Sequence, residues 1–281
     1  MDNLPESFAD VSPFATNSSQ SSETQVNNGK DSVPKFNPNE LYYDMSGEKY
    51  LLIFNHYTYK TTKYFRNKRP ADRKGTEQDV VELKRVFMKM GYKVLVHNDL
   101  EYENIMKIIK TISIQNHNDT ACLCIAILTH GDKNEELFAA DMPYSLRDIT
   151  VKLENGHEGL VGKPKLFFIQ ACRGDGLDAG RTVETDGGGR TMILPSSADF
   201  LFVRSSVEGY YSFRNTNGSF LIQELCKAIE DHYEDKDIHY ITTAVNRNVA
   251  YEYSTYTLDS KTNNKKQMPE VRHTLTKLFM F

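Results

Sequence analysis

The sequence of 281 residues has no tryptophan, only four cysteines and no long apolar run. Four cysteines are too few for a disulfide scaffold, and Cys122, Cys124 and Cys226 fall in apolar-periodic segments where buried, reduced thiols are expected. No stretch reaches the roughly 18 apolar residues of a membrane span. The start, MDNLPESFAD, has no signal-peptide character. We therefore expect a cytoplasmic protein without a membrane partner.

Charge and ligand-binding motifs are also sparse. The net charge is −4, so no field over the whole chain favours nucleic acid as a partner. Cys122 and Cys124 have no second His or Cys pair at zinc spacing. The segment Glu158–Pro164 lacks the first glycine of a phosphate-binding loop. We expect neither a metal nor a cofactor.

The pattern of apolar residues changes along the chain. Residues 1–40 are rich in Ser, Asn, Gln, Thr and Pro, which predicts a disordered leader. Apolar runs typical of buried strands then alternate with helix-period segments, of which the first begins with Thr76-x-x-Asp79 and ends at Gly91. The predicted strands are 50–54, 92–97, 121–128, 165–170, 199–203 and 271–281, and the later helices are centred on 105–112, 220–233 and 238–251.

This alternation predicts a doubly wound α/β fold, a six-stranded, mostly parallel sheet with helices on both faces. One segment interrupts it. Residues 174–197 contain six glycines and almost no apolar periodicity. A loop of that length inside a compact domain indicates a functional or cuttable segment.

Two reactive side chains follow two successive predicted strands. His130 comes after the strand ending at Leu128, and Cys172 comes after the strand ending at Gln170. Ligands of open parallel sheets sit at the carboxyl ends of strands, and an imidazole beside a thiol can take its proton. The backbone N–H groups of Gly131 and Cys172 would then face an oxyanion. The alternatives are a structural histidine and a buried core cysteine.

Three segments resemble one enzyme family. Gln170-Ala-Cys-Arg-Gly174 matches the Q-A-C-[RQG]-G signature of caspases, with His130 upstream. The segment 73–79, RKGTEQD, is similar to the family's Arg-x-Gly-Thr segment, and 209–215, GYYSFRN, is similar to its peptide-binding segment. The chain resembles a caspase from about Asn39 to its last residue, and its short leader is typical of the executioner, or effector, type.

The resemblance implies roles for individual residues. Cys172 would be the nucleophile and His130 the acid and base. Arg73, Gln170 and Arg214 would line the pocket for the aspartate before the cleaved bond, because guanidinium groups fit a carboxylate. Ser212 and Arg214 would bind the peptide backbone. Tyr211 and Phe213 would form the wall of the next pocket, and Asn215 would reach the most distant one.

The sequence also departs from the commonest family pattern. Phe213 and Phe220 stand where tryptophans are frequent, and the loop Asn215–Gly218 is one residue short. The preference of the most distant pocket is therefore left open.

The glycine-rich break predicts proteolytic activation. Val183-Glu-Thr-Asp186 before Gly187 is an aspartate-terminated site in an exposed loop, suited to cutting by an upstream caspase. Cleavage there would give a large subunit from 41–186 and a small subunit from 187–281 that together form one catalytic domain. In the leader, Asp31 before Ser32 is favoured over Asp10 before Val11, because serine is the smaller following residue.

The predicted function is an apoptotic effector caspase, a zymogen whose substrates are proteins cut after aspartate. The apolar terminal strand and the resemblance imply a homodimer, and inhibitor-of-apoptosis proteins are further expected partners. A metacaspase is disfavoured because its basic substrates would need an acidic pocket, whereas Arg73 and Arg214 are basic. A legumain is disfavoured because it would need a secretory signal. The remaining alternative is a catalytically inert caspase-like protein that regulates a binding partner.

Overall fold

A single mixed sheet carries the fold of the described residues. The computed structural model describes residues 37–132, 136–172, 195–207, 212–215, 218–255 and 263–281, with Arg214 and Asn215 described by their backbone alone. These residues belong to one compact unit, Ser32–Phe281. The sheet has the strand order β11-β8-β7-β3-β1-β2. Its strands are β1 Glu48–Asn55, β2 Lys93–Asn98, β3 Thr120–Leu128, β7 Lys165–Gln170, β8 Phe200–Arg204 and β11 Glu270–His273.

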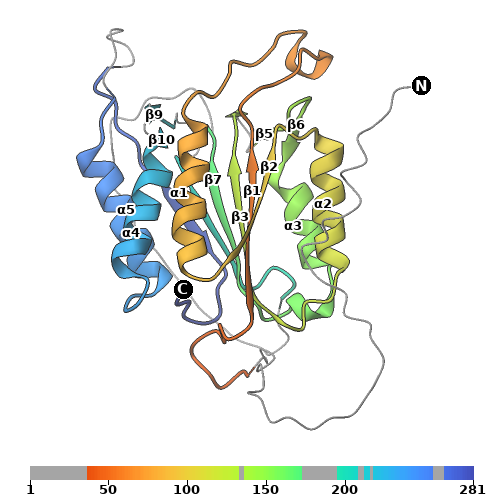
Figure 1. Cartoon of the computed structure of the whole chain (residues 1–281), viewed down its shortest axis with the longest axis vertical. Coiled ribbons are helices and arrows are strands. Elements are labelled where there is room, and N and C mark those ends of the chain that lie inside the picture. Colours follow the sequence, from red (N-terminus) through yellow and green to blue (C-terminus); the bar gives the residue numbers. More distant parts are fainter. Residues whose placement is uncertain (1–36, 133–135, 173–194, 208–211, 216–217, 256–262) are drawn as a thin grey trace. The chain divides into compact units, whose positions relative to one another are not determined.

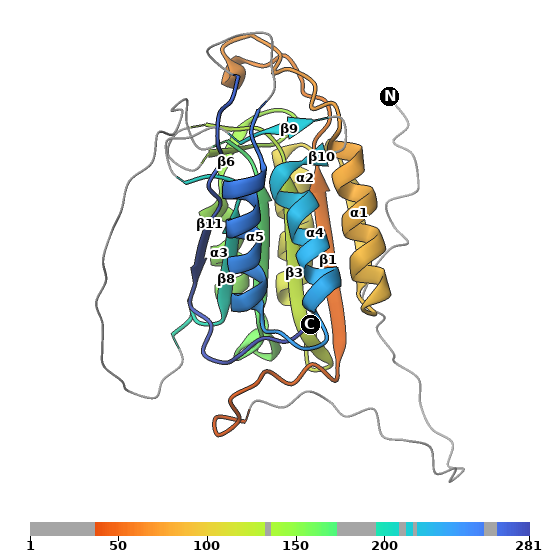
Figure 2. The same cartoon turned by 90° about the vertical axis from the view of Figure 1, so that its left-hand side faces the viewer.

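Helices cover both faces of this sheet. In Figure 1, α1, α4 and α5 lie on one side and α2 and α3 on the other, and Figure 2 shows the first group in front of the strands. Their bounds are α1 Thr76–Lys89, α2 Tyr102–Ile114, α3 Leu146–Glu154, α4 Phe220–His232 and α5 Ile238–Glu252. The predicted α/β architecture is therefore confirmed. Among the described residues, no helix has the length and apolar character needed to cross a bilayer.

Apolar strands and helix faces form the core, as their sequence patterns predict. All nine residues of β3 are buried, which matches a central strand covered on both faces. On α1, Phe87 is fully buried, and its ring lies 5.0 Å from that of Tyr92 and 5.8 Å from that of Phe168. Truncating a phenylalanine in such a position costs about 3–5 kcal/mol.

The start of α1 differs from the prediction. Gly75, with φ +88°, is the residue before the first turn, and no side chain caps the helix. Thr76 donates its hydroxyl to Asn55 instead, and Asp79 accepts from the backbone N–H of Ser219. Both predicted capping side chains are therefore engaged in tertiary contacts.

The predicted terminal strand 271–281 is also wrong in its length. β11 ends at His273, antiparallel to β8 at the edge of the sheet. Beyond it, the backbone N–H of Leu278 donates to Leu41, and Phe279 is fully buried in the core. The last residues therefore pair with the segment around Leu41 and pack into the core instead of extending the edge strand.

Several short elements escape the sequence pattern. They are the antiparallel β4 Gly131–Asp132, β5 Glu136–Phe138 and β6 Pro143–Ser145, the pair β9 Arg214–Asn215 and β10 Gly218–Ser219, the helix α3, and the 3-10 turns η2 Lys63–Phe65 and η4 Glu158–Leu160. Strands of two or three residues are too short to show a period of two. β4 begins directly after His130, and β9 begins two residues after Ser212.

Candidate active site

The strand order places the candidate site at one end of the sheet. From β1 the chain moves outward to β2, and from β3 it moves in the opposite direction to β7 and β8. A reversal of this kind opens a crevice beyond the carboxyl ends of the strands, where ligands of such sheets bind. Arg73 follows β1 in the chain, His130 follows β3 and Cys172 follows β7.

The register between β3 and β7 aligns the predicted catalytic pair. Leu128 pairs with Gln170, and the backbone N–H of Thr129 donates to the Gln170 carbonyl at 3.0 Å. His130 and Cys172 each lie two residues beyond that pair. The sequence-based prediction that these residues meet at one sheet edge agrees with this register.

His130 is held by its backbone and by its ring. Its backbone N–H donates to the Tyr59 hydroxyl at 3.0 Å, and its ring Nε2 lies 2.8 Å from the carbonyl oxygen of Ala71. The Tyr59 and His130 ring centroids are 5.1 Å apart. Because a carbonyl can only accept, Nε2 carries the proton in the neutral ring and Nδ1 is left with the lone pair.

Cys172 is a half-buried free thiol. Its Sγ lies 3.5 Å from the hydroxyl of Ser212 and 3.9 Å from the carbonyl of that residue. The preceding residue, Ala171, is fixed by Ser205, whose hydroxyl donates to the Ala171 carbonyl at 2.8 Å and accepts from its N–H at 3.2 Å. Ser205 is fully buried, so these contacts anchor the backbone that carries the thiol.

Gly131 packs directly against the cysteine backbone. A Cβ at this position would collide with the carbonyl oxygen of Cys172 and lie 2.8 Å from that of Glu136. Only glycine fits this close approach. The sequence pointed to Gly131 for its N–H group, and the structure adds a steric reason for the residue.

Arg73 is almost fully buried, with 1% of its surface exposed. Its Nη1 donates to the His56 carbonyl at 3.1 Å and to the Thr76 hydroxyl at 2.7 Å. Thr76 donates onward to Asn55, and Asn55 donates to Asn98 at the end of β2. The predicted specificity arginine is thus tied to the carboxyl ends of β1 and β2.

The imidazole of His56 lies against this arrangement. Burial lowers the pKa of His56 to about 4, with a further lowering contribution from the charge of Arg73. Its Nε2 donates to the Leu100 carbonyl at 2.9 Å. A neutral His56 therefore adds no second positive charge beside the guanidinium at physiological pH.

Gln170 and Ser212 come together, as predicted for one pocket. The Gln170 Nε2 donates to the Ser212 hydroxyl at 3.1 Å, and Gln170 is 2% exposed. Next to them, the Phe213 and Phe220 ring centroids are 6.3 Å apart, and Phe220 lies 4.6 Å from Tyr253. Three aromatic rings therefore stand beside the serine that contacts the thiol.

The backbone of Arg214 and Asn215 forms β9, which pairs with β10. The Asp79 carboxylate accepts from the backbone N–H of Ser219 at 2.7 Å, which joins this hairpin to α1. The side chains of Arg214 and Asn215 lie outside the described residues, as do Tyr211, Asp186 and Asp31.

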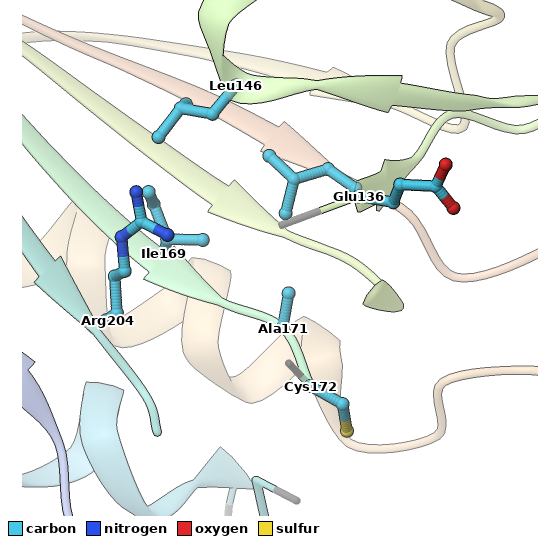
Figure 3. Close-up of a pocket in the computed structure, with 7 residues that line it drawn as sticks. Glu136, Leu146, Ile169, Ala171, Cys172 and Arg204 are labelled. Carbon is cyan, nitrogen blue, oxygen red and sulfur yellow. The ribbon is translucent and has the colours of Figure 1, made fainter. Parts of the chain in front are cut away.

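A hollow adjoins Cys172 but differs from the predicted aspartate pocket. It is lined by Glu136, Leu137, Leu146, Ile169, Ala171, Cys172 and Arg204. In Figure 3 the Arg204 side chain extends toward Ile169, whereas the cysteine sulfur points away from these residues. Neither Arg73 nor Gln170 lines this hollow, so its position does not bear on aspartate recognition.

Sequence reasoning missed four residues that support the site, namely Asn55, Tyr59, Thr76 and Ser205. The Thr76 hydroxyl contacts Arg73 and Asn55. The Tyr59 hydroxyl contacts the His130 backbone, and the Ser205 hydroxyl contacts the backbone before Cys172. Thr76 alone lies in a quoted motif, where its type suggested a helix cap. The other three follow no local pattern that would have distinguished them.

Comparisons with known proteins agree with this arrangement. The family model for the caspase domain matches residues 48–280. The chain is 39% identical over 215 residues to caspase-3 of Mesocricetus auratus, covering 74% of this chain and 76% of that protein. It is 37% identical to caspase drICE of Drosophila melanogaster, covering 82% and 68%. The crystal structure of caspase-1 from Spodoptera frugiperda superposes with a TM-score of 0.78 at 34% identity, covering 90% and 97%.

Proposed function

The chain belongs to the caspase family, and we propose that it is an effector caspase of apoptosis, made as a zymogen, with Cys172 as nucleophile and His130 as acid and base. As a caspase it is a cysteine-type endopeptidase that cleaves after aspartate. The observation that supports the assignment of the pair is the β3–β7 register, in which Leu128 pairs with Gln170, two residues before His130 and Cys172 respectively.

The proposed chemistry proceeds through a thioester. The Cys172 thiol loses its proton to Nδ1 of His130, and its sulfur attacks the carbonyl carbon of the substrate aspartate. The N–H groups of Gly131 and Cys172 stabilise the resulting oxyanion. Collapse breaks the C–N bond, and His130 returns the proton to the leaving amine. Water activated by the same ring then hydrolyses the thioester and restores the thiol.

The proposed aspartate pocket combines Arg73, Gln170 and Arg214. A buried guanidinium without a carboxylate partner in the substrate is unfavourable, so substrates with a neutral residue at this position would leave an uncompensated charge. Two observations support this assignment. Arg73 is 1% exposed, and its Nη1 is held by a hydrogen bond to the Thr76 hydroxyl. Ser212 and Arg214 would bind the peptide backbone. Tyr211 and Phe213 would form the wall of the next pocket, and Asn215 would reach the most distant one.

Activation is proposed to follow cleavage after Asp186 by an upstream caspase, with a second cut at Asp31. The large subunit would then end at 186 and the small subunit would begin at 187. Strands β7 and β8 flank the cut in the sequence and are parallel neighbours in the sheet, which supports a single domain that persists after cleavage.

We also propose a cytoplasmic homodimer of cleaved protomers, regulated by inhibitor-of-apoptosis proteins. The family implies dimerisation, and β11 supports it here because it is an edge strand of the six-stranded sheet.

The test is peptide cleavage before and after processing at Asp186. Full-length protein is given fluorogenic peptides that end in Asp, Glu, Lys or Leu, and the Asp series should be cleaved far best, with processing raising the rate. Cys172→Ala should abolish the activity. Equal cleavage of the Lys series would contradict the pocket. If a thiol-reactive inhibitor with an aspartyl group left Cys172 unlabelled, the inert alternative would replace the proposal.

A further inference from the structure

The connection between β1 and α1 is strongly basic. We call residues 57–74 the basic loop. Seven of its 18 residues are Lys or Arg and one is acidic, in a chain whose net charge is −4. The basic residues are Lys60, Lys63, Arg66, Lys68, Arg69, Arg73 and Lys74. A local field of this kind acts on charged partners even when the whole protein is mildly acidic.

The tip of the basic loop has a defined conformation. Arg66 and Asn67 both have φ +55°, in the left-handed region that non-glycine residues seldom occupy. Backbone hydrogen bonds from Asn67 to Thr62 at 2.9 Å and from Lys68 to Phe65 at 3.0 Å hold this turn. The backbone that carries the charged side chains of the tip is therefore held by hydrogen bonds.

A buried aromatic side chain fixes the tip to the rest of the protein. Phe65 is 9% exposed, and its ring centroid lies 4.9 Å from that of Phe138 on β5. It also meets Tyr59 edge-on. Because Tyr59 also contacts His130, the same aromatic residues pack against both the basic loop and the candidate active site.

Several charges of the loop have structural partners. Lys60 pairs with Glu101, and Arg69 pairs with Asp72 and donates to the Tyr59 carbonyl. Arg73 is buried in the proposed aspartate pocket. These contacts account for the fold of the loop and for the predicted subsite.

Among the described residues, three cations at the tip neither form such ion pairs nor belong to the proposed aspartate pocket. They are Lys63, Arg66 and Lys68. All three are exposed, and within the described part of the chain no ion pair joins them to an acidic side chain. Lys63 lies 5.1 Å from the ring of Tyr64, itself 52% exposed. Three cations are thus gathered at the tip of the loop and face solvent.

The position of this tip indicates what it would bind. The loop, orange in Figure 1, crosses the end of the sheet that carries His130, and Ala71 in the loop contacts the His130 ring. We propose that Lys63, Arg66 and Lys68 form an accessory docking surface for an acidic segment of the protein substrate, beyond the subsites around the cleaved bond. This inference rests on the proposed function.

A protein segment suits the surface better than nucleic acid does. A substrate bound at the cleavage site holds its neighbouring residues close to the loop at high effective concentration, so three surface cations suffice to add affinity. Nucleic acid is not held at the cleavage site in this way. Its binding depends on many phosphate contacts, and the net charge of −4 means that the rest of the protein surface repels phosphates.

The experiment compares substrates that differ only outside the cleavage site. Processed full chain receives a short Asp peptide and the same peptide extended at either end with alternating Glu and Gly or with alternating Gln and Gly. The loop variant is K63E/R66E/K68E. The control variant K84E/K107E/K110E reverses three exposed lysines on α1 and α2, so both proteins have the same total charge.

We expect the wild type to cleave a Glu-extended peptide about three- to tenfold better in kcat/KM than its Gln counterpart at low salt, chiefly through KM. High salt should remove this preference because surface charges are screened over about 10 Å at 0.1 M. The loop variant should lose the preference and the control should keep it. Both variants should cleave the short peptide like the wild type.

Three results would overturn the inference. They are no preference in the wild type at either end, an equal loss in the loop and control variants, and an RNA oligonucleotide that binds through the loop residues while Glu extension has no effect. A wild type that fails to cleave the short Asp peptide would instead overturn the proposed function, together with the docking surface that rests on it.

Discussion

The Arg73 guanidinium donates to the Thr76 hydroxyl across 2.7 Å, three residues further along the chain. Because arginine can only donate, the Thr76 proton must point elsewhere, and it goes to the Asn55 side-chain oxygen at 2.6 Å. The Asn55 amide then donates to Asn98 at 2.9 Å. The direction of every bond is set by the arginine, so Thr76 acts as a positioning residue for the proposed aspartate pocket.

Replacing Thr76 by Val removes the hydroxyl at nearly constant volume and should loosen Arg73. A hydrogen bond to a charged group contributes about 1.5–3 kcal/mol, so kcat/KM for Asp peptides should fall about tenfold to hundredfold, with a larger change in KM than in kcat. The ratio of kcat/KM for Asp peptides to kcat/KM for Glu peptides should decrease. Peptide kinetics on both series measure this.

Two substitutions serve as controls for Thr76. Thr76→Ser keeps the hydroxyl and should retain most of the selectivity. Thr242→Val removes a buried hydroxyl on α5 that bonds to its own helix, so it should change stability without changing selectivity. If Thr76→Val kept full discrimination between Asp and Glu, Thr76 would have only a structural role.

Gly131→Ala should inactivate the enzyme out of proportion to its effect on folding. The new Cβ meets two backbone carbonyls, those of Cys172 and Glu136, and neither can move without shifting the candidate site. We expect kcat to fall by about a hundredfold or more, as for loss of an oxyanion donor. Active-site titration with a thiol-reactive aspartyl inhibitor, together with thermal unfolding, measures both effects.

Gly156→Ala is the matched control for Gly131. Its Cβ would lie 2.6 Å from the Ser113 carbonyl, a similar backbone clash away from the candidate site. It should lower stability but leave the activity of the folded fraction intact. Comparable losses of activity in both variants would mean that any backbone clash of this size inactivates the protein, and that Gly131 has no special role at the candidate site.

Tyr59→Phe should slow catalysis by disturbing His130. The Thr129 hydroxyl donates to the Phe138 carbonyl, so the Tyr59 hydroxyl donates to Thr129 at 3.0 Å while accepting from the His130 N–H. Loss of this hydroxyl leaves the N–H without that acceptor, and kcat should fall about tenfold with little change in KM. Steady-state kinetics measure the two constants separately.

Tyr144→Phe is the control for Tyr59. Tyr144 is buried, and its hydroxyl has no hydrogen-bond partner among the described residues, so its removal should leave kcat unchanged. A full-rate Tyr59→Phe enzyme would show that the backbone contact of His130 does not affect the chemistry.

His56 should make the protein less stable in acid. Above pH about 6.5, His56 is neutral in both the folded and the unfolded chain. Between pH 6.5 and 4 the unfolded chain binds a proton at His56 and the folded protein does not, because the folded pKa is about 4. The free energy of unfolding should therefore fall with pH, by about 2 kcal/mol from this residue between pH 7.5 and 5.

Urea unfolding at the two pH values tests this contribution. His56→Gln can still donate to the Leu100 carbonyl but does not titrate, so its loss of stability on acidification should be smaller by that amount. His232→Gln, at a half-buried position on α4, should behave like the wild type. Equal acid sensitivity in the wild type and His56→Gln would contradict the prediction.

Local patterns were sufficient for most of the sheet and for the positions of His130 and Cys172 at its carboxyl end. Strands such as Lys165–Gln170 are continuous apolar runs, and the reactive residues lie directly after them, so the order of elements along the chain determined which side chains meet at one edge. The Q-A-C-R-G segment added the family. Residues 1–36, Asp186 and the side chain of Arg214 lie outside the described residues, so the predicted leader, processing site and second pocket arginine stay predictions.

The sequence by itself determined the strands, the helices that separate them and the cysteine and histidine at their ends, because periodicity and motif spacing are properties of neighbouring residues. Tertiary structure alone decided that Thr76 donates to Asn55 instead of capping α1, that Tyr59 supports His130 and that Phe279 packs into the core instead of extending the edge strand. These choices depend on which groups burial brings within hydrogen-bonding distance. A side chain that could satisfy either a local or a distant partner takes the one that leaves fewer buried polar groups without a bond.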